Sequence, residues 1–525
     1  MSIWYIDNLI LKRDVHNEKS KKALQNFSWT PVHFSRSNSL KYVQPRFLPQ
    51  VKAAVLSCWV NLASGASMAY VTPALQTLQL PDSGLALSDS QASWVASLSM
   101  LGAFLGGISV GPCIALGRRR ALWLVALPLA VSWALVAAAT AVWHLCLAQF
   151  LSGICMAITA DASQVYVSET VSAERRGSLG CVPMLMFNLG TLACWCAGAW
   201  LPWDQLAMFC AALALPSLLL PLWFPESPSY LVAHSRTQQA LHSLYQLRGK
   251  RCDINFEYQE LLQCDKGTGF RESMRHMCDN DLLKPLFIMA AVRILSRFCG
   301  LRAILTYTKD LLHSTHSVLD ERQANIIIGS VQLAATLFGS LVVDKLGRRN
   351  ILMASQFVMG MSLAALGSFF YFFDESDCAH NSALSWVPLA AILVYIVCNS
   401  VGLSPVSGIL IGELVPQRYR HVTSSLTGAA SWLSAFIVTK TFVDLDRYLH
   451  LYGTMWLYCL MCFLGVVFVF FALPETRGLS QYAIDVLFVH SVEDDDEEDY
   501  RCPPPTTRRH SSLKSVDINE NQTRL

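Results

Sequence analysis

Twelve long apolar runs constrain the fold of this chain more than any other feature of its sequence. A helix needs about 20 apolar residues to cross the hydrocarbon core of a bilayer, and each run is close to that length. The runs therefore predict an all-α, polytopic membrane protein with twelve transmembrane helices. They lie at 52–72, 92–112, 121–141, 145–167, 178–199, 204–224, 284–306, 323–343, 351–372, 386–411, 422–442 and 450–472.

The composition agrees with a membrane protein. Of the 525 residues, 53% are hydrophobic and 15% are charged, and the mean hydropathy is +0.37, whereas a soluble domain carries roughly 25% charged residues. The net charge of +2 argues against a strongly basic nucleic-acid binder. The sequence contains no phosphate-binding loop, nucleophile elbow, nucleotide fingerprint or metal-ligand spacing, so we expect no enzymatic activity, no cofactor and no bound metal.

Positive charges indicate how the helices cross the membrane. Arginine and lysine gather in the loops on one side, and the loops after the first, third, fifth and ninth runs contain neither residue. By the positive-inside rule, both termini and the central loop then face the cytosol. We expect a multi-pass protein of the plasma membrane, monomeric, whose partners are the lipid bilayer and a small-molecule solute.

The runs and the polar stretches between them divide the chain into five segments. Two six-helix bundles at 51–224 and 283–473 are joined by a polar, cytosolic helical linker at 225–282. A cytosolic segment at 1–50 precedes them. The segment 474–525 follows them, and its acidic run and its prolines predict a cytosolic, largely disordered tail.

Three signals occur once in each half of the chain. An arginine-rich turn follows the second run as Gly117-Arg118-Arg119-Arg120, and its counterpart after the eighth run extends from Asp344 to Arg349. An acid precedes an arginine by seven residues at Glu169 and Arg176, and again at Glu413 and Arg420. The sixth and twelfth runs end in Pro-Glu-Ser and Pro-Glu-Thr. Such a repeat of six helices is typical of carriers that rock one half against the other.

The repeated charges predict two cytosolic latches between neighbouring helices. A guanidinium can hold a carboxylate with two hydrogen bonds, so arginine suits a contact that forms in one state and breaks in another. The residues expected to form these latches are Arg118, Arg119, Glu169, Arg176, Asp344, Arg348, Arg349, Glu413 and Arg420.

These motifs resemble the sugar-porter family of the major facilitator superfamily, from about Val51 to Gly478. The resemblance rests on 165–177, on PESPSYL at 225–231 and on PETRG at 474–478. Within the family, SMAYVTPAL at 67–75 and WLSAFIVTKTF at 432–442 are most similar to the insect facilitated trehalose transporters. The resemblance implies two pseudo-symmetric six-helix bundles around a central cavity. It also implies facilitated diffusion of a sugar, a hexose or trehalose, by alternating access.

At the positions that bind the sugar in the resembled family, this chain has other residues. In helix 7 the family has two glutamines, a serine-glycine pair and an asparagine, and these positions are Ser296, Arg297, Cys299, Gly300 and Arg302 in this chain. The helix 5 glutamine falls on Met184, the helix 10 tryptophan on Gly408 and the helix 11 asparagine on Ser431. The remaining candidates for the substrate site are Asp161, Arg297, Arg302, Thr306, Tyr307, Gln332, Asn399, Ser400 and Trp432.

Four charges lie inside the apolar runs and more than two residues from their ends: Asp161 in the fourth run, and Arg293, Arg297 and Arg302 in the seventh. Each costs on the order of 3 kcal/mol at mid-membrane unless it is paired or faces water. Helical spacing places Arg293 and Arg297 on one face and Arg302 away from it. Two interpretations stay open. Arg297 or Arg302 faces the cavity and attracts an anionic solute, or one arginine pairs with Asp161 and the others reach the surface.

Coupling and function leave further alternatives. Proton-driven members of the resembled family carry an acid in helix 1, whereas 51–72 contains none, which favours passive transport. Asp161 would be the proton carrier if transport were coupled. The rivals to a sugar carrier are an organic-anion carrier that uses Arg297 or Arg302, and a non-transporting sugar receptor. Ile114, at a position where the family's gating motif has aspartate, supports the receptor, and Asp344 in the second copy opposes it.

Overall fold

The structure is a computed structural model of the whole chain. It describes residues 47–78, 85, 87–172, 179–249, 254–264, 280–307, 321–373, 386–414 and 420–475. All of them belong to one compact unit, Pro45–Leu525. Every regular element in these ranges is a helix, which confirms the predicted all-α class. The expectations for 1–46 and for the tail beyond 475 lie outside the described residues.

Seven helices and two 3-10 turns form the first half of the helical body. The sixth run ends in 3-10 geometry, because Pro216 and Pro221 lack the N–H that an α-helix would use there. The elements are α3 (Phe47–Ser57), α4 (Trp59–Leu78), α5 (Asp89–Ala115), α6 (Arg118–Ala137), α7 (Val142–Thr170), α9 (Val182–Gly198), α10 (Trp203–Ala214), η3 (Leu215–Leu218) and η4 (Leu220–Trp223).

The second half contains two interrupted spans and one very long helix. Gly300 separates α15 (Asn280–Phe298) from α16 (Leu301–Thr306), and a π-helical turn, η7 (Asn399–Leu403), separates α21 (Val387–Cys398) from α22 (Ser404–Leu414). Helix α23 (Arg420–Ala472) holds the last two apolar runs and has one non-helical residue, His450. The remaining helices are α18 (Glu321–Leu346) and α19 (Arg348–Phe372).

Each predicted apolar run lies on helix, although nine segments meet a strict length and hydropathy criterion among the described residues. The difference has three physical causes. Helix α23 counts once for two runs, α9 is 17 residues long, and α15 carries Arg293 and Arg297. Large apolar side chains also point outward, as at Leu341 (68% exposed) and Phe471 (81% exposed), as expected for surfaces that lipid covers.

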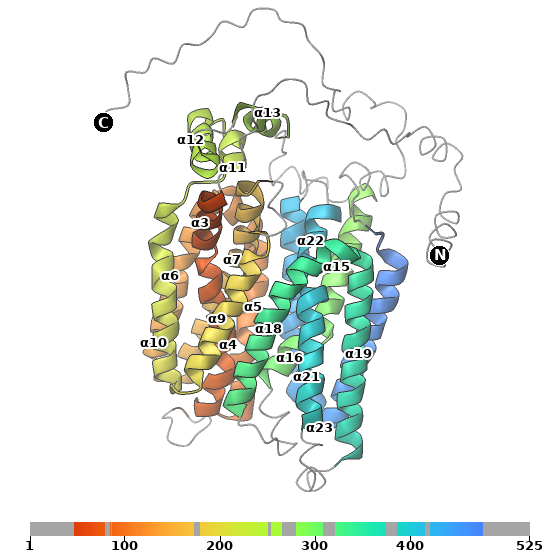
Figure 1. Cartoon of the computed structure of the whole chain (residues 1–525). Coiled ribbons are helices and arrows are strands. Elements are labelled where there is room, and N and C mark those ends of the chain that lie inside the picture. Colours follow the sequence, from red (N-terminus) through yellow and green to blue (C-terminus); the bar gives the residue numbers. More distant parts are fainter. Residues whose placement is uncertain are drawn as a thin grey trace, which may run out of the picture. The chain divides into compact units, whose positions relative to one another are not determined.

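The helices of each half pack mainly on one another (Figure 1). Helix α7 packs on α5 and α6, and α4 packs on α9 and α10; in the second half, α19 and α15 pack on α23. Small residues allow these close approaches: a Cβ on Gly153 would lie 1.9 Å from the Ser99 carbonyl oxygen. The two halves meet where α5 packs on α23 and α9 packs on α18.

Three short helices lie between the halves in sequence: α11 (Pro228–Ala233), α12 (Thr237–Arg248) and α13 (Ile254–Cys264). Arg248 fastens them to the first half, because its Nη1 donates to the Thr170 carbonyl at 2.6 Å and its Nη2 pairs with Glu257 at 2.6 Å. The helices therefore sit at the end of the body where α7 ends (Figure 1). We call this end, which also carries Gly117 and Gly347, the motif end.

Candidate substrate site and gating network

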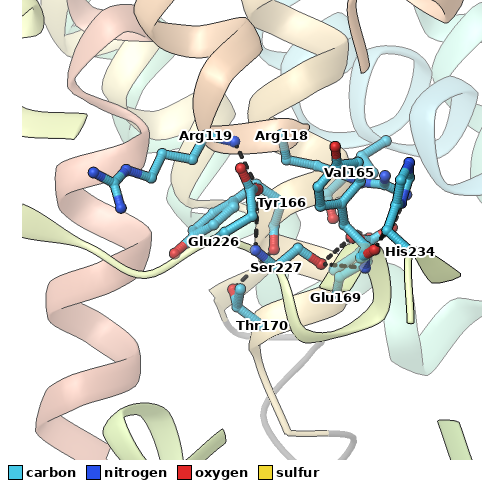
Figure 2. A network of polar contacts seen from close by, with 11 residues as sticks. Arg118, Arg119, Val165, Tyr166, Glu169, Thr170, Glu226, Ser227 and His234 are labelled. Atoms are coloured by element: carbon cyan, nitrogen blue, oxygen red, sulfur yellow. Dashed lines mark hydrogen bonds and ion pairs between the residues drawn. The ribbon is translucent and has the colours of Figure 1, made fainter. Parts of the chain in front are cut away.

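An ion pair joins α6 to α7 at the motif end. Arg118 Nη2 lies 2.8 Å from Glu169 Oε1, and both side chains are largely buried, at 11% and 17% exposure. The hydroxyl of Ser227 donates to the other oxygen of the same carboxylate, and the Arg118 guanidinium lies 5.3 Å from the centre of the Tyr230 ring. Figure 2 shows this network. The predicted latch partners Arg118 and Glu169 are in contact.

A second carboxylate, Glu226, binds the start of α6. Its Oε1 accepts the Arg119 backbone N–H at 2.9 Å and the Ser227 N–H at 3.1 Å. A carboxylate is favourable there because the first N–H groups of a helix have no partner inside it and the helix dipole is positive at that end. Gly117, at φ +120°, precedes the helix, and a Cβ on it would lie 2.9 Å from Glu226 Oε2. The glycine thus makes room for the acid.

The second half repeats this arrangement. Glu475 accepts the Arg348 N–H at 2.9 Å and the Arg349 N–H at 3.2 Å. Gly347 has φ +86°, and a Cβ on it would lie 2.8 Å from Glu475 Oε2. Arg349 Nη2 donates to the Phe470 carbonyl at 2.6 Å. The duplication read from the sequence therefore extends to matching hydrogen bonds.

The part that Glu226 and Glu475 play was not predicted from the sequence. Their Pro-Glu motifs stood out as a repeated signal, but the acids expected in the latches were Glu169, Asp344 and Glu413. Arg119 and Arg348 contribute their backbone N–H groups to this network, and the Arg119 guanidinium points away from Glu169 in Figure 2. Arg176 and the side chains of Asp344, Glu413 and Arg420 lie outside the described residues, so their predicted contacts stay predictions.

The partly buried charges Asp161 and Arg293 lie where α7, α15 and α23 come together. Ser424 donates to the Asp161 carboxylate, and Arg293 is the cation that acts on Asp161. Arg293 Nη1 donates to Thr427 Oγ1 at 3.3 Å. A Cβ on Gly428 would lie 3.4 Å from Arg293 Nη1 and 3.6 Å from Asp161 Oδ2. Asp161 and Arg293 therefore lie near each other beside Gly428, and their opposite charges attract across the junction of the two halves.

Arg297 and Arg302 have different surroundings. Arg297 Nε donates to Ser431 at 2.9 Å, and its guanidinium lies 4.9 Å from the centre of the Trp432 ring. The Arg302 guanidinium lies 5.9 Å from the centre of the Phe187 ring, and its buried Nε–H has no hydrogen-bond partner. Cation–π contact gives about 0.5–2 kcal/mol, which is less than the roughly 3 kcal/mol that a mid-membrane charge costs. The aromatic rings thus offset only part of that cost.

Gly300 decides the direction of Arg302. The glycine adopts a left-handed conformation, with φ +86°, and ends α15 two residues before Arg302. The helical wheel that places Arg302 away from Arg297 does not apply across such a break, and both guanidinium groups lie against rings, Trp432 and Phe187, of one cluster. Arg293 and Arg297 do share a face, as their spacing predicts, because they contact Thr427 and Ser431 of the same helix.

Amides join the two halves beside Phe187. Asn188 Nδ2 donates to Thr336 Oγ1 at 2.8 Å, and Gln332 Nε2 donates to Asn188 Oδ1 at 3.1 Å. Gln332 Oε1 is buried without a hydrogen-bond partner. Asn188 was missed in the sequence, although an isolated amide within an apolar run, one helical turn after Met184, is the signal that could have identified it.

The other candidates lie apart from this region. Asn399 and Ser400 are buried in the π-helical turn η7, which packs on α18 and α19. Tyr307 stacks on Phe442 at 4.8 Å, and Thr306 is the last residue of α16. The described residues contain no group of three His, Cys, Asp or Glu side chains that could hold a metal ion.

Away from the motif end, the halves meet through a lysine. Lys440 Nζ donates to Ser93 Oγ at 3.2 Å and lies 4.4 Å from the centre of the Trp94 ring. Thr72 Oγ1 donates to the Leu305 carbonyl at 3.4 Å. Ser93 is near the start of α5, whose other end is at the motif end. These contacts therefore hold the halves together at the end opposite the motifs.

Comparison with known proteins places this arrangement in a family. Residues 33–488 match the family described as "Sugar (and other) transporter". The chain is 33% identical over 446 residues to the facilitated trehalose transporter Tret1 of Polypedilum vanderplanki, across 83% of this chain and 87% of that protein. It is 34% identical over 442 residues to the Tret1-2 homolog of Drosophila simulans, across 83% and 90% of the two chains. It spans about half of some longer relatives, such as 55% of Tret1 of Anopheles gambiae.

Solved structures of transporters have a similar fold. The major facilitator proton:xylose symporter XylE bound to 6-bromo-6-deoxy-D-glucose superposes with a TM-score of 0.70 at 22% identity, over 84% of this chain and 99% of that chain. A partially occluded, inward-open structure of the xylose transporter XylE from E. coli gives 0.68 at 22% identity, over 83% and 100%. The chain therefore belongs to the sugar (and other) transporter family of membrane transporters, which are not enzymes, and it has the major facilitator fold.

Proposed function

We propose that this protein carries a sugar across the membrane by facilitated diffusion with alternating access. The observation that carries the proposal is the duplicated network at the motif end, in which each half has its own carboxylate bound to the start of a helix beside an arginine-rich turn. Two halves that are each braced internally can rock as rigid units about contacts between them. The leading substrates are a hexose and trehalose, since relatives named as trehalose transporters are about a third identical to this chain.

The motif end faces the cytosol in this proposal, and the protein resides as a monomer in the plasma membrane. The positive charges of Arg118, Arg119, Arg348 and Arg349 support this orientation through the positive-inside rule. Segments 51–224 and 283–473 are the moving bundles, and 225–282 is the cytosolic linker. The pair of Arg118 and Glu169 then stabilises the first half at its cytosolic end.

The solute binds between the halves, where Arg297, Arg302, Gln332 and Trp432 of the second half lie against Phe187 and Asn188 of the first half. The hydrogen bonds that cross this interface involve hydroxyls and amides, which can exchange partners with a solute. Thr306 and Tyr307 close the path at the end away from the motifs. Asn399 and Ser400 stand on the C-terminal wall, in a π-helical turn that can change its geometry.

Transport is passive in this proposal. Helices α3 and α4 contain no acid, and the interior acid Asp161 already has Arg293 and Ser424 as partners. A carboxylate beside a cation loses that attraction when it takes up a proton. We therefore expect sugar uptake to be the same at external pH 5.5 and at external pH 7.5. These values lie about one unit below and above the pKa of an unperturbed histidine.

Radiotracer uptake in oocytes tests the function. The full chain should raise saturable uptake of glucose or trehalose above that of uninjected oocytes, and Arg118→Gln should lower it because Glu169 loses its charged partner. Arg236→Gln, an exposed arginine at the start of α12, is the matched control. Surface expression without flux of any sugar would contradict the carrier and favour a receptor. A pH-dependent flux that disappears in Asp161→Asn would contradict passive transport.

A further inference from the structure

The interior of the helical body carries more positive than negative charge. Asp161 is the one acid away from the ends of the apolar runs, whereas the seventh run holds Arg293, Arg297 and Arg302. Asp161 is engaged by Arg293 and Ser424. Two cations in the interior therefore have no acid of the apolar runs to neutralise them.

Both remaining guanidinium groups lie on aromatic rings that belong to one cluster. Trp432, beneath Arg297, and Phe187, beneath Arg302, pack against the same small core of Ala103, Met156 and Ala157. Phe187 is on α9 of the first half, and Trp432 is on α23 of the second half. The two cations therefore lie around one junction between the halves and not on the lipid-facing surface.

Two polar atoms at this junction are buried and have no hydrogen-bond partner. Arg302 Nε is a charged donor, and Gln332 Oε1 is an acceptor. They are close in the fold, because Arg302 lies on Phe187 while Gln332 donates to the adjacent residue Asn188. A buried polar atom without a partner is rare and costly, so a donor and an acceptor that meet at one junction point to a ligand that supplies both bonds.

The helix break at Gly300 separates the two cations in sequence. Arg297 is on α15 and Arg302 on α16, yet both guanidinium groups lie against rings of one aromatic cluster. Arginine suits a carboxylate or a phosphate, because its planar fork donates two parallel hydrogen bonds to two oxygens. A bound anion would neutralise this positive charge and use Arg302 Nε.

We propose that the central site also takes a sugar that bears one anionic group, a carboxylate or a phosphate, held between Arg297 and Arg302, while Gln332 accepts a hydrogen bond from a sugar hydroxyl. This inference rests on the proposed function, because it assigns the substrate class of the same central site. Arg293 is excluded from the binding pair because it donates to Thr427 and lies beside Gly428 near the opposite charge of Asp161. The sugar ring can stack on Trp432 or Phe187, both of which lie at the junction.

Uptake into proteoliposomes that contain the purified full chain tests this proposal. The probes are radiolabelled glucose and trehalose as neutral sugars, and glucuronate and glucose 6-phosphate as carboxylate and phosphate forms. We expect saturable uptake of at least one anionic sugar. That sugar, added in excess, should also lower the uptake of glucose and trehalose. Arg297→Gln and Arg302→Gln should each lower anionic uptake at least tenfold and neutral uptake by less than threefold. Arg236→Gln should change neither.

Charge movement gives an independent readout that needs no variant. Passive transport of a neutral sugar moves no charge, whereas an anionic sugar carries its charge across. An inside-positive potential imposed with potassium and valinomycin should therefore raise uptake of the anionic sugar and leave glucose uptake unchanged.

If Arg302→Gln does not fold, Arg302→Lys keeps a cation at this position without the planar fork, and it should weaken anionic uptake severalfold.

Each remaining outcome separates this inference from the function on which it rests. If glucose or trehalose is carried and a hundredfold excess of either anionic sugar does not compete, the inference is wrong and the carrier stands. If inorganic phosphate competes as well as glucose 6-phosphate, the site recognises a free anion and the sugar assignment is wrong. If folded protein carries none of the four probes, both proposals are wrong.

Discussion

Asp161 and Arg293 show how strongly a single side chain can matter in the interior of this protein. Their charges lie on opposite halves and meet beside Gly428, with Ser424 and Thr427 as hydrogen-bond partners. Removal of one charge leaves the other without its counter-ion in a medium of low polarity, so the cost is the desolvation of a charge and not only the loss of an attraction.

Asp161→Asn should lower the free energy of unfolding by about 3 kcal/mol, the cost of leaving one member of a buried pair uncompensated. Arg293→Gln should cost a similar amount, and the double variant should recover most of the loss, because neither charge then remains. Thermal unfolding in detergent of the wild type, both single variants and the double variant measures this. Single-variant losses that add in the double variant would contradict the pair.

Gly117 is needed for its backbone angle and for its missing side chain. Gly117→Ala forces a Cβ into a conformation with φ +120° and toward Glu226, so we expect a loss of about 1–3 kcal/mol. Gly408→Ala is the matched control, because that glycine is in α22 with open space around it, and helix propensity predicts a gain of up to about 1 kcal/mol. The two melting temperatures should move in opposite directions. A shift of the same sign would contradict this account of Gly117.

At the scale of single elements, breaks within helices determine the direction of the side chains that follow. Gly300 breaks the seventh span, and the π-helical turn η7 interrupts the tenth. A continuous helix would direct residues by a fixed angle along its length, whereas a break resets that angle. The direction of Arg302, which lies against Phe187, follows from this reset.

Contacts of Lys440 join α23 to α5 at the end opposite the motifs. Lys440→Met should weaken this closure, because a cation–π contact of about 0.5–1 kcal/mol and a charged hydrogen bond of about 1.5 kcal/mol disappear together. The measurement is the labelling rate, with a membrane-impermeant thiol reagent, of a cysteine introduced by Thr72→Cys. We expect at least a fivefold rise over the Thr72→Cys protein with Lys440 intact. The Lys440→Met protein with Thr72 gives the background of the native cysteines, and an unchanged rate would show that Lys440 does not hold this end closed.

The two halves should respond alike at the scale of the whole molecule, because they contain equivalent networks. Glu226→Gln and Glu475→Gln each remove a negative charge from the start of a helix, where it contributes up to about 2 kcal/mol. We expect each variant to lower the melting temperature by a similar amount. The effects should add in the double variant, since the two glutamates share no partner. A double variant no less stable than either single variant would contradict two independent networks.

The sequence by itself determined the class of the fold, the positions of the helices and the family. Hydropathy and run length are properties of a local segment, so the twelve runs could be read without any knowledge of packing. The duplication was readable for the same reason, because Gly117 and Gly347 precede equivalent helices in equivalent sequences. The ends of helices were less accurate: α6 begins at Arg118, inside its charged turn, because Glu226 binds its first N–H groups.

The tertiary structure alone decided which residues meet. Asp161 has Arg293 as its partner, Asn188 joins Gln332, and Glu226 and Glu475 bind the starts of α6 and α19. Each of these contacts joins segments more than a hundred residues apart in sequence, or depends on the backbone angle of one glycine. Long-range pairing depends on how helices pack against one another, and no local pattern of residues encodes that packing. The helices were therefore predictable from the sequence, and the central site was not.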